Sequence, residues 1–264
     1  MLHYQSKHLT VFQSALYKTT SSLIESQKVM LLVDPNWLPE EIKEVKRHVE
    51  QAGENKELYI LYTHSDFDHI IGAGAFPDAK TIASEAFHLH ADKEAIVREC
   101  IDFDLKYYIE RNYEHIYPTI DHVIIGDGQQ LVIEDLTLTF TLAPGHTDDG
   151  LFTYVEPYGI FLAGDYLSDV EIPFIYSGYQ DYLKTLGQAK HLLENCEVNV
   201  LVPGHGNVTI SKNDMWERLN FSMKYVKELP DNSQLEDECR KKFSFYDGMH
   251  ESHVANIKQA RKEK

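Results

Sequence analysis

The stretch Leu58-Tyr-Ile-Leu-Tyr-Thr-His-Ser-Asp-Phe-Asp-His69 decides the fold that we expect for this chain. Its first six residues are apolar or β-branched, as in a buried strand. Four titratable side chains follow at once, at His64, Asp66, Asp68 and His69. Open α/β sheets usually place their binding sites at the carboxyl ends of strands. The stretch therefore predicts a strand that ends in a polar site.

The same layout recurs three times further along the chain. The alternating segment 136–142 leads into Pro144-Gly-His-Thr147, the segment 159–163 ends at Gly164-Asp165, and the apolar segment 198–202 ends in Pro203-Gly-His-Gly206. Strict alternation predicts a strand with one buried face. If the strands lie side by side with their carboxyl ends together, the polar residues that follow them converge.

Imidazoles and carboxylates in such a cluster are suitable ligands for zinc, iron or manganese. A single His or Asp in a loop is more often a cap, a turn former or a solvated charge. Four titratable residues within six positions, with two later Gly-His steps, favour metal binding. The set is too large for one tetrahedral ion and suits two ions that share a carboxylate. The predicted metal ligands are His64, Asp66, Asp68, His69, His146, Asp165 and His205.

The rest of the chain predicts alternating sheet and helix. We expect strands near residues 8–18, 29–34, 58–63, 80–84, 121–142, 151–155, 159–163 and 198–202. We expect helices near residues 39–53, 85–117, 180–194 and 211–264. Strands followed by helices in both halves indicate an α/β fold in which two sheets form a sandwich with helices outside.

The four motifs, in their order along the chain, resemble the metal-binding motifs of the metallo-β-lactamase superfamily. The resemblance covers about residues 8–210. It implies an αββα sandwich with the site at one edge of the two sheets. We therefore expect a catalytic domain over residues 1–210 and a C-terminal helical extension, residues 211–264, packed on the same domain.

The resemblance also implies a role for each motif residue. His64 and His146 would serve a first ion, Asp165 would bridge, and a second ion would take Asp68, His69 and His205. Asp66 departs from the usual His-x-His-x-Asp-His pattern, because it stands where the second histidine normally sits. The flavodiiron branch has a glutamate there, so a carboxylate is tolerated, bound either directly or through water. Zinc is the first expectation for the two divalent ions, and a harder oxygen ligand brings in iron or manganese as alternatives.

The predicted activity is hydrolysis of a small ester, lactone, thioester or related substrate by a metal-bridging hydroxide. Asp68 would orient the hydroxide and pass a proton to the leaving group. Tyr166, next to Asp165, could donate to a developing oxyanion or could simply pack between sheet and helix. The alternatives are a flavodiiron-like iron oxidoreductase, a small-molecule phosphodiesterase and a non-catalytic binding protein. The sequence holds no cysteine cluster for an iron–sulfur centre.

The composition limits the classes of binding partner that we expect. The 264 residues carry a net charge of −17, which disfavours binding to nucleic acid or anionic lipid. Three dispersed cysteines indicate no disulfide framework, and no signal peptide or membrane span is evident. We expect a cytoplasmic enzyme with a small-molecule substrate, and homodimer formation stays open. The aromatic segment 101–117 and the C-terminal helices are either core or a roof over the site, and a roof would imply a substrate with an apolar part.

Overall fold

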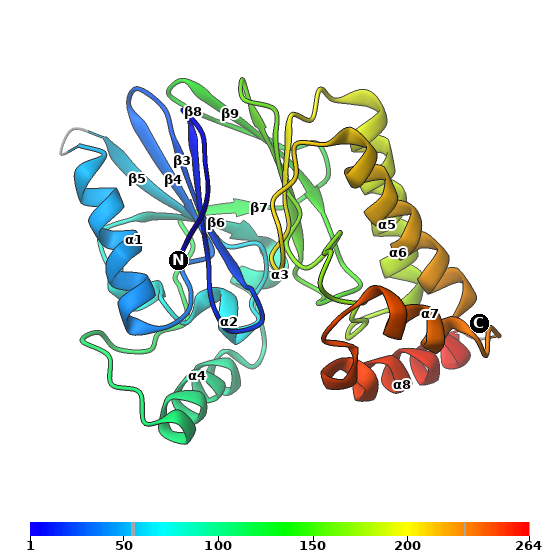
Figure 1. Ribbon diagram of the computed structural model, residues 1–264. Coiled ribbons are helices and arrows are strands. Elements are labelled where there is room, and N and C mark those ends of the chain that lie inside the picture. Colours follow the sequence, from blue (N-terminus) through cyan, green and yellow to red (C-terminus); the bar gives the residue numbers. More distant parts are fainter. Residues whose placement is uncertain (54–55, 230, 264) are drawn as a thin grey trace.

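The computed structural model describes residues 1–53, 56–229 and 231–263. Two β-sheets lie in the middle of the molecule with helices on their outer sides (Figure 1). Apolar side chains from both sheets, such as Leu31 and Leu61 in one and Leu138 and Leu162 in the other, share one buried core. The α/β sandwich that the sequence predicts is therefore confirmed.

The first sheet has seven strands and comes from the first half of the chain. Its order is β1 (Leu2–Gln5), β2 (Leu9–Gln13), β3 (Thr20–Glu25), β4 (Val29–Val33), β5 (Glu57–Leu61), β6 (Lys80–Ser84) and β7 (His122–Ile124). From β4 to β7 all pairs are parallel. The carboxyl ends of these strands consequently lie along one edge of the sheet.

The second sheet has five strands. Its order is β12 (Val200–Val202), β11 (Ile160–Leu162), β10 (Leu151–Glu156), β9 (Leu136–Leu142) and β8 (Gln130–Ile133). The β11–β12 pair is parallel, and β9 and β11 both pair antiparallel with β10. Strands β9, β11 and β12 therefore run in the same direction, and the three loops that follow them leave the sheet at one edge.

Helices cover the outer face of each sheet (Figure 1). With the first sheet lie α1 (Pro39–Gln51), α2 (Phe67–Ile70), the 3₁₀ turn η1 (Ala73–Ala75), α3 (Glu85–His88) and α4 (Lys93–Tyr107). With the second sheet lie α5 (Tyr179–Asn195), α6 (Lys212–Glu228), α7 (Leu235–Lys242) and α8 (Tyr246–Glu263). Helix α1 begins at a proline, and the Glu41 carboxylate accepts a hydrogen bond from the Leu38 backbone N–H at 3.0 Å. Both features are typical of a helix start.

The C-terminal helices share a core with the second sheet. Leu219 and Tyr225 of α6 and Met249 of α8 belong to the same buried cluster as Phe152 and Phe161 of the sheet. The predicted extension, residues 211–264, includes positions 230 and 264, which lie outside the described residues. Within the described ranges, no helix combines the length and apolarity needed to cross a membrane.

Several local expectations were wrong. Helix α4 ends at Tyr107, and Tyr108 takes a left-handed conformation with φ of 55°, so residues 109–117 are not helical. Arg111 fixes this segment, because its guanidinium bonds both oxygens of Asp104 at 2.7 and 3.0 Å and donates to the Trp37 carbonyl at 2.7 Å. Strands β1 and β3 were also missed, and the Thr and Ser residues of β3 weaken its apolar signal.

Candidate metal centre

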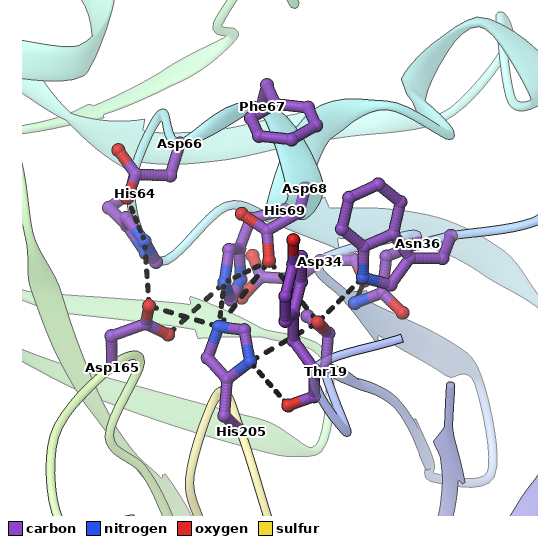
Figure 2. Close-up of polar contacts among 12 residues, drawn as sticks. Thr19, Asp34, Asn36, His64, Asp66, Phe67, Asp68, His69, Asp165 and His205 are labelled. Atoms are coloured by element: carbon purple, nitrogen blue, oxygen red, sulfur yellow. Dashed lines mark hydrogen bonds and ion pairs between the residues drawn. The ribbon is translucent and has the colours of Figure 1, made fainter. Parts of the chain in front are cut away.

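The predicted ligands all lie on loops or short helices that follow strands at one edge of the sandwich. His64 and Asp66 follow β5, and Asp68 and His69 lie on α2, which comes directly after them. His146 follows β9, Asp165 follows β11 and His205 follows β12. Figure 2 shows how the side chains of His64, Asp66, Asp68, His69, Asp165 and His205 point toward one another.

The first group of side chains consists of His64, Asp66, His146 and Asp165. His146 Nε2 lies 3.2 Å from Asp66 Oδ2 and 3.1 Å from Asp165 Oδ2. His64 Nε2 lies 3.7 and 3.6 Å from the same two oxygens. Asp66 therefore faces the same centre as the two histidines, in the position expected of a ligand.

The second group consists of Asp68, His69 and His205. His69 Nε2 and His205 Nε2 are 3.3 Å apart, and they lie 3.6 and 3.4 Å from Asp68 Oδ2. Asp165 contacts this group as well, with Oδ1 at 3.1 Å from His69 Nε2 and Oδ2 at 3.1 Å from His205 Nε2. Asp165 thus contacts imidazoles of both groups.

Every histidine of the centre is oriented by an oxygen on its other ring nitrogen. Those oxygens belong to Thr63 for His64, Asp34 for His69, Phe174 for His146 and Tyr17 for His205, at 3.0 Å in each case. A metal-ligating histidine almost always has such a partner, which fixes its tautomer and ring direction. The arrangement leaves all four Nε2 atoms turned toward the centre.

Without a cation, these acids and imidazoles perturb one another strongly. Burial by itself lowers the pKa of His205, but Asp165 and Glu171 outweigh it and raise that pKa to about 10. Burial by itself raises the pKa of Asp165, but His205 and the other three imidazoles hold it well below its usual range. Protons therefore sit where a divalent ion would supply positive charge, and metal binding would displace them.

Among the residues that the structure describes, no hydrogen-bond partner is found for two buried atoms of the centre, His64 Nε2 and Asp165 Oδ1. Unpaired buried polar atoms are rare in folded proteins and often mark the place of an ion or water. Together with a nitrogen and oxygen donor set, they show that the residues present fit a divalent transition-metal ion.

Close backbone approach makes this geometry possible at Gly204. A Cβ atom there would lie 2.2 Å from Asp165 Oδ1 and 3.0 Å from His69 Cε1. The first contact is too short for any Cβ atom and the second is tight, so the Pro-Gly-His step that ends at His205 requires its glycine. The spacing of that motif therefore reflects packing of the loop against Asp165.

Comparison with known proteins agrees with this geometry. The family model of the metallo-beta-lactamase superfamily matches residues 16–205. The chain belongs to the metallo-beta-lactamase superfamily. The match spans every residue that the two groups contribute, while α6, α7 and α8 lie beyond it.

Solved structures of this superfamily share the fold at low sequence identity. A stereoselective inverting sec-alkylsulfatase from Pseudomonas sp. superposes with a TM-score of 0.71 and 13% identity, covering 88% of this chain. This chain spans only 42% of that enzyme's length. A metallo-beta-lactamase family protein from Thermus thermophilus has a TM-score of 0.65 and 20% identity, covering 98% of this chain and 94% of its own. A B3 metallo-beta-lactamase with an active-site glutamic acid gives 0.57 and 17%, covering 86% and 88%.

The structure does not bring the Tyr166 hydroxyl to the centre, which corrects its candidate role as an oxyanion donor. Tyr166 is buried, and its hydroxyl accepts from the His146 N–H at 3.0 Å and lies 2.9 Å from the Pro144 carbonyl. The ring packs against Phe152 and Tyr182. Tyr166 therefore holds the loop of His146 in place, which is the packing alternative.

Two residues outside the predicted set support the second group. Asp34, at the end of β4, bonds His69 and also accepts from the Thr63 N–H at 2.8 Å and the Thr63 hydroxyl at 2.6 Å. Thr19 places its hydroxyl 3.2 Å from Asp68 Oδ2 and 3.3 Å from His205 Nδ1, and it accepts from the Trp37 indole at 2.7 Å (Figure 2). Asp34 repeats the pattern of an acid after a buried strand, so the sequence contained a signal for it. Thr19 carried none.

A cavity of about 900 Å³ opens beside the centre. Asp66, Asp68, His146, Asp165 and His205 line it, so both groups face the same space. Another part of the lining comes from the segment at and just before α8, and consists of Ser244, Phe245, Asp247, Gly248, Met249 and Ser252. The predicted roof is therefore formed at the start of the last helix, while α4 contributes Glu99 to the lining.

Burial raises the pKa of two further carboxyl groups in this cavity, Glu99 and Glu171. The Glu171 pKa is raised to about 7, chiefly by desolvation and against the opposing effect of His205. Its Oε1 lies 3.7 Å from His205 Nδ1, on the face of the ring away from the centre.

Proposed function

We propose that this chain is a dinuclear metal-dependent hydrolase of small esters, lactones or thioesters. The observation that carries the proposal is the position of Asp165, whose two oxygens reach imidazoles of both groups at 3.1 Å. Two divalent ions held by these groups would supply Lewis acidity and an activated water. The set comprises His64, Asp66, His146, Asp68, His69, His205 and the shared Asp165.

Asp68 is the residue best placed to handle a proton. It lines the cavity, and the Thr19 hydroxyl lies 3.2 Å from its Oδ2. A carboxylate fixed in this way can accept a proton from the attacking water and return it to the leaving group. The lining includes the aromatic rings of Phe67, Phe174 and Phe245, which would hold the apolar part of a substrate and exclude water around the reacting bond.

Two alternative functions, an iron-dependent redox enzyme and a phosphodiesterase, are less well supported by this site. A carboxylate at Asp66 is a harder ligand than imidazole, which favours iron and with it a redox enzyme. Acidic residues in the cavity disfavour a phosphodiester, because its negative charge would meet Glu99 and Glu171. Hydrolysis of an uncharged acyl group suits the cavity better than either alternative.

Metal analysis followed by a substrate panel tests the proposal. We expect the purified protein to hold two transition-metal ions per chain and to cleave esters, lactones or thioesters in preference to bis(4-nitrophenyl) phosphate. Activity should vanish after treatment with dipicolinate and return when zinc or manganese is added. A protein that binds no transition metal, or one that consumes oxygen with iron and hydrolyses nothing, would contradict the proposal.

A further inference from the structure

The cavity beside the metal centre is rich in aromatic rings. They come from loops before β3 and α5 and from the segments that carry α2 and α8. The residues are Tyr17, Phe67, Phe174, Tyr176 and Phe245. The face of an aromatic ring carries partial negative charge, so it attracts a cation as well as apolar groups.

The charged side chains of the lining that lie outside the ligand set are mainly acidic. They are Glu99, Glu171 and Asp247, against one basic residue among the described lining residues, Lys18. Arg240 pairs with Asp247 and offsets its charge. Glu99, exposed on α4, and Glu171, half-buried beside His205, therefore remain.

Lys18 does not reverse this balance. Its ammonium group lies over the Phe245 ring at 5.9 Å from the ring centroid. Lys18 therefore connects the loop before β3 with the segment before α8. At the centre itself, Asp66, Asp68 and Asp165 offset most of the charge that two divalent ions would bring. Because Glu171 faces His205 and its pKa is raised to about 7, the charge that a substrate meets beyond the reacting bond is set chiefly by Glu99 and the aromatic faces.

We propose that this site takes substrates in which a positively charged group, a quaternary or protonated amine, accompanies the acyl bond to be cleaved. This inference rests on the proposed function, because it names the substrate class of the same site. The net charge of −17 on the whole chain acts in the same direction, since it raises the local concentration of cations and repels anions.

Three thioesters of matched size test the charge preference. They are acetylthiocholine, its uncharged isostere S-(3,3-dimethylbutyl) thioacetate, and the anionic 3-(acetylthio)propanoate, which release a thiol that can be followed by colour. For the metal-loaded protein we expect kcat/KM to be about fivefold or more higher for the cation than for the isostere. The anion should be the poorest of the three. Equal values for the first two, or preference for the anion, would overturn the inference.

Variants assign the preference to particular side chains. Glu99→Gln should lower the ratio of cation to isostere about threefold, as expected for loss of one exposed ionic contact. Glu94→Gln is the matched control, because Glu94 is exposed on the same helix but does not line the cavity. It should leave the ratio unchanged. Lys18→Gln should raise the ratio. Equal effects of E99Q and E94Q would show that only the overall charge matters.

A binding measurement separates this inference from the proposed function. (4-Oxopentyl)trimethylammonium and 6,6-dimethylheptan-2-one replace the thioester sulfur by CH₂ and cannot be hydrolysed. Calorimetry on the metal-loaded protein should show tighter binding of the charged ketone. If no thioester is cleaved but this preference holds, the proposed function fails and the inference stands. If the thioesters are cleaved and both ketones bind equally, the inference fails alone.

Discussion

The two halves of the metal centre differ in how firmly the protein holds them. In the second group, the Asp68 side chain is 11% exposed and that of His69 is fully buried, and Thr19 and Asp34 contact them. In the first group, Asp66 has a side chain that is 33% exposed and its contacts are the two histidines. Rigid supporting contacts strengthen a metal site. We therefore expect the second group to hold its ion more tightly and the first group to exchange with solvent and substrate.

The largest expected effect comes from removing what the two halves share. Asp165→Asn should abolish tight binding of both ions and lower kcat/KM by more than about 100-fold, beyond the range seen for supporting residues. Metal content by mass spectrometry of the desalted protein checks this. Asp148→Asn, at an exposed aspartate two residues after His146, is the control and should retain both ions. Retention of one full equivalent by D165N would argue against a bridge.

The next-largest effect comes from the solvent-exposed carboxylate of the first group, Asp66. Asp66→Asn should weaken the first ion by about 10- to 100-fold and leave the second nearly unchanged. Titration of the metal-free protein against a chelating indicator would then show one tight and one weak equivalent. If D66N weakens both ions equally, or weakens neither, the exposed carboxylate is not a ligand of one half.

A smaller effect tests the support of the buried side. Thr19→Val removes the hydroxyl that contacts Asp68 and His205 and should weaken the second ion about tenfold. Thr19→Ser retains the hydroxyl and should restore the affinity. A structural role alone would lower stability in both variants without this difference in metal affinity. Equal affinities of T19V and T19S would remove Thr19 from the comparison.

The smallest effect is on stability against pH in the metal-free protein. The folded-state pKa of His205 is raised to about 10, so its stabilisation is fully present below an unfolded pKa near 6.5 and is lost as pH rises toward 10. Raised pKa values of His69 and His146 act with the same sign. Melting temperature should therefore fall by about 5 °C or more over this range without metal and change less with zinc bound. A metal-free protein whose stability rises with pH would contradict this account.

Much of the fold could be predicted because its strands are apolar and end abruptly. The expected strands at 80–84 and 136–142 match β6 and β9, since a single alternating or buried pattern decided each. The segment 109–117 could not be assigned in this way. Its conformation depends on the ion pair between Arg111 and Asp104, which join across a helix end rather than through a local pattern.

The residues of the metal centre show the same difference between what a local sequence pattern predicts and what it does not. Its seven candidate ligands could be found because each stands directly after a strand, where chain direction alone brings them together. Thr19 could not, because it reaches Asp68 and His205 across 49 and 186 positions of sequence and belongs to no motif. Tyr166 shows the opposite error, because a residue adjacent to Asp165 in sequence points its hydroxyl to the backbone around His146.

Part of the cavity wall comes from a different region of the chain than the candidate metal ligands. The reactive groups lie within residues 64–205, whereas Phe245, Met249 and Ser252 come from a tail beyond the matched family region. Part of the cavity wall is therefore encoded outside the stretch that supplies the candidate metal ligands. Redesign of the tail offers a route to new substrates that leaves the chemical apparatus untouched.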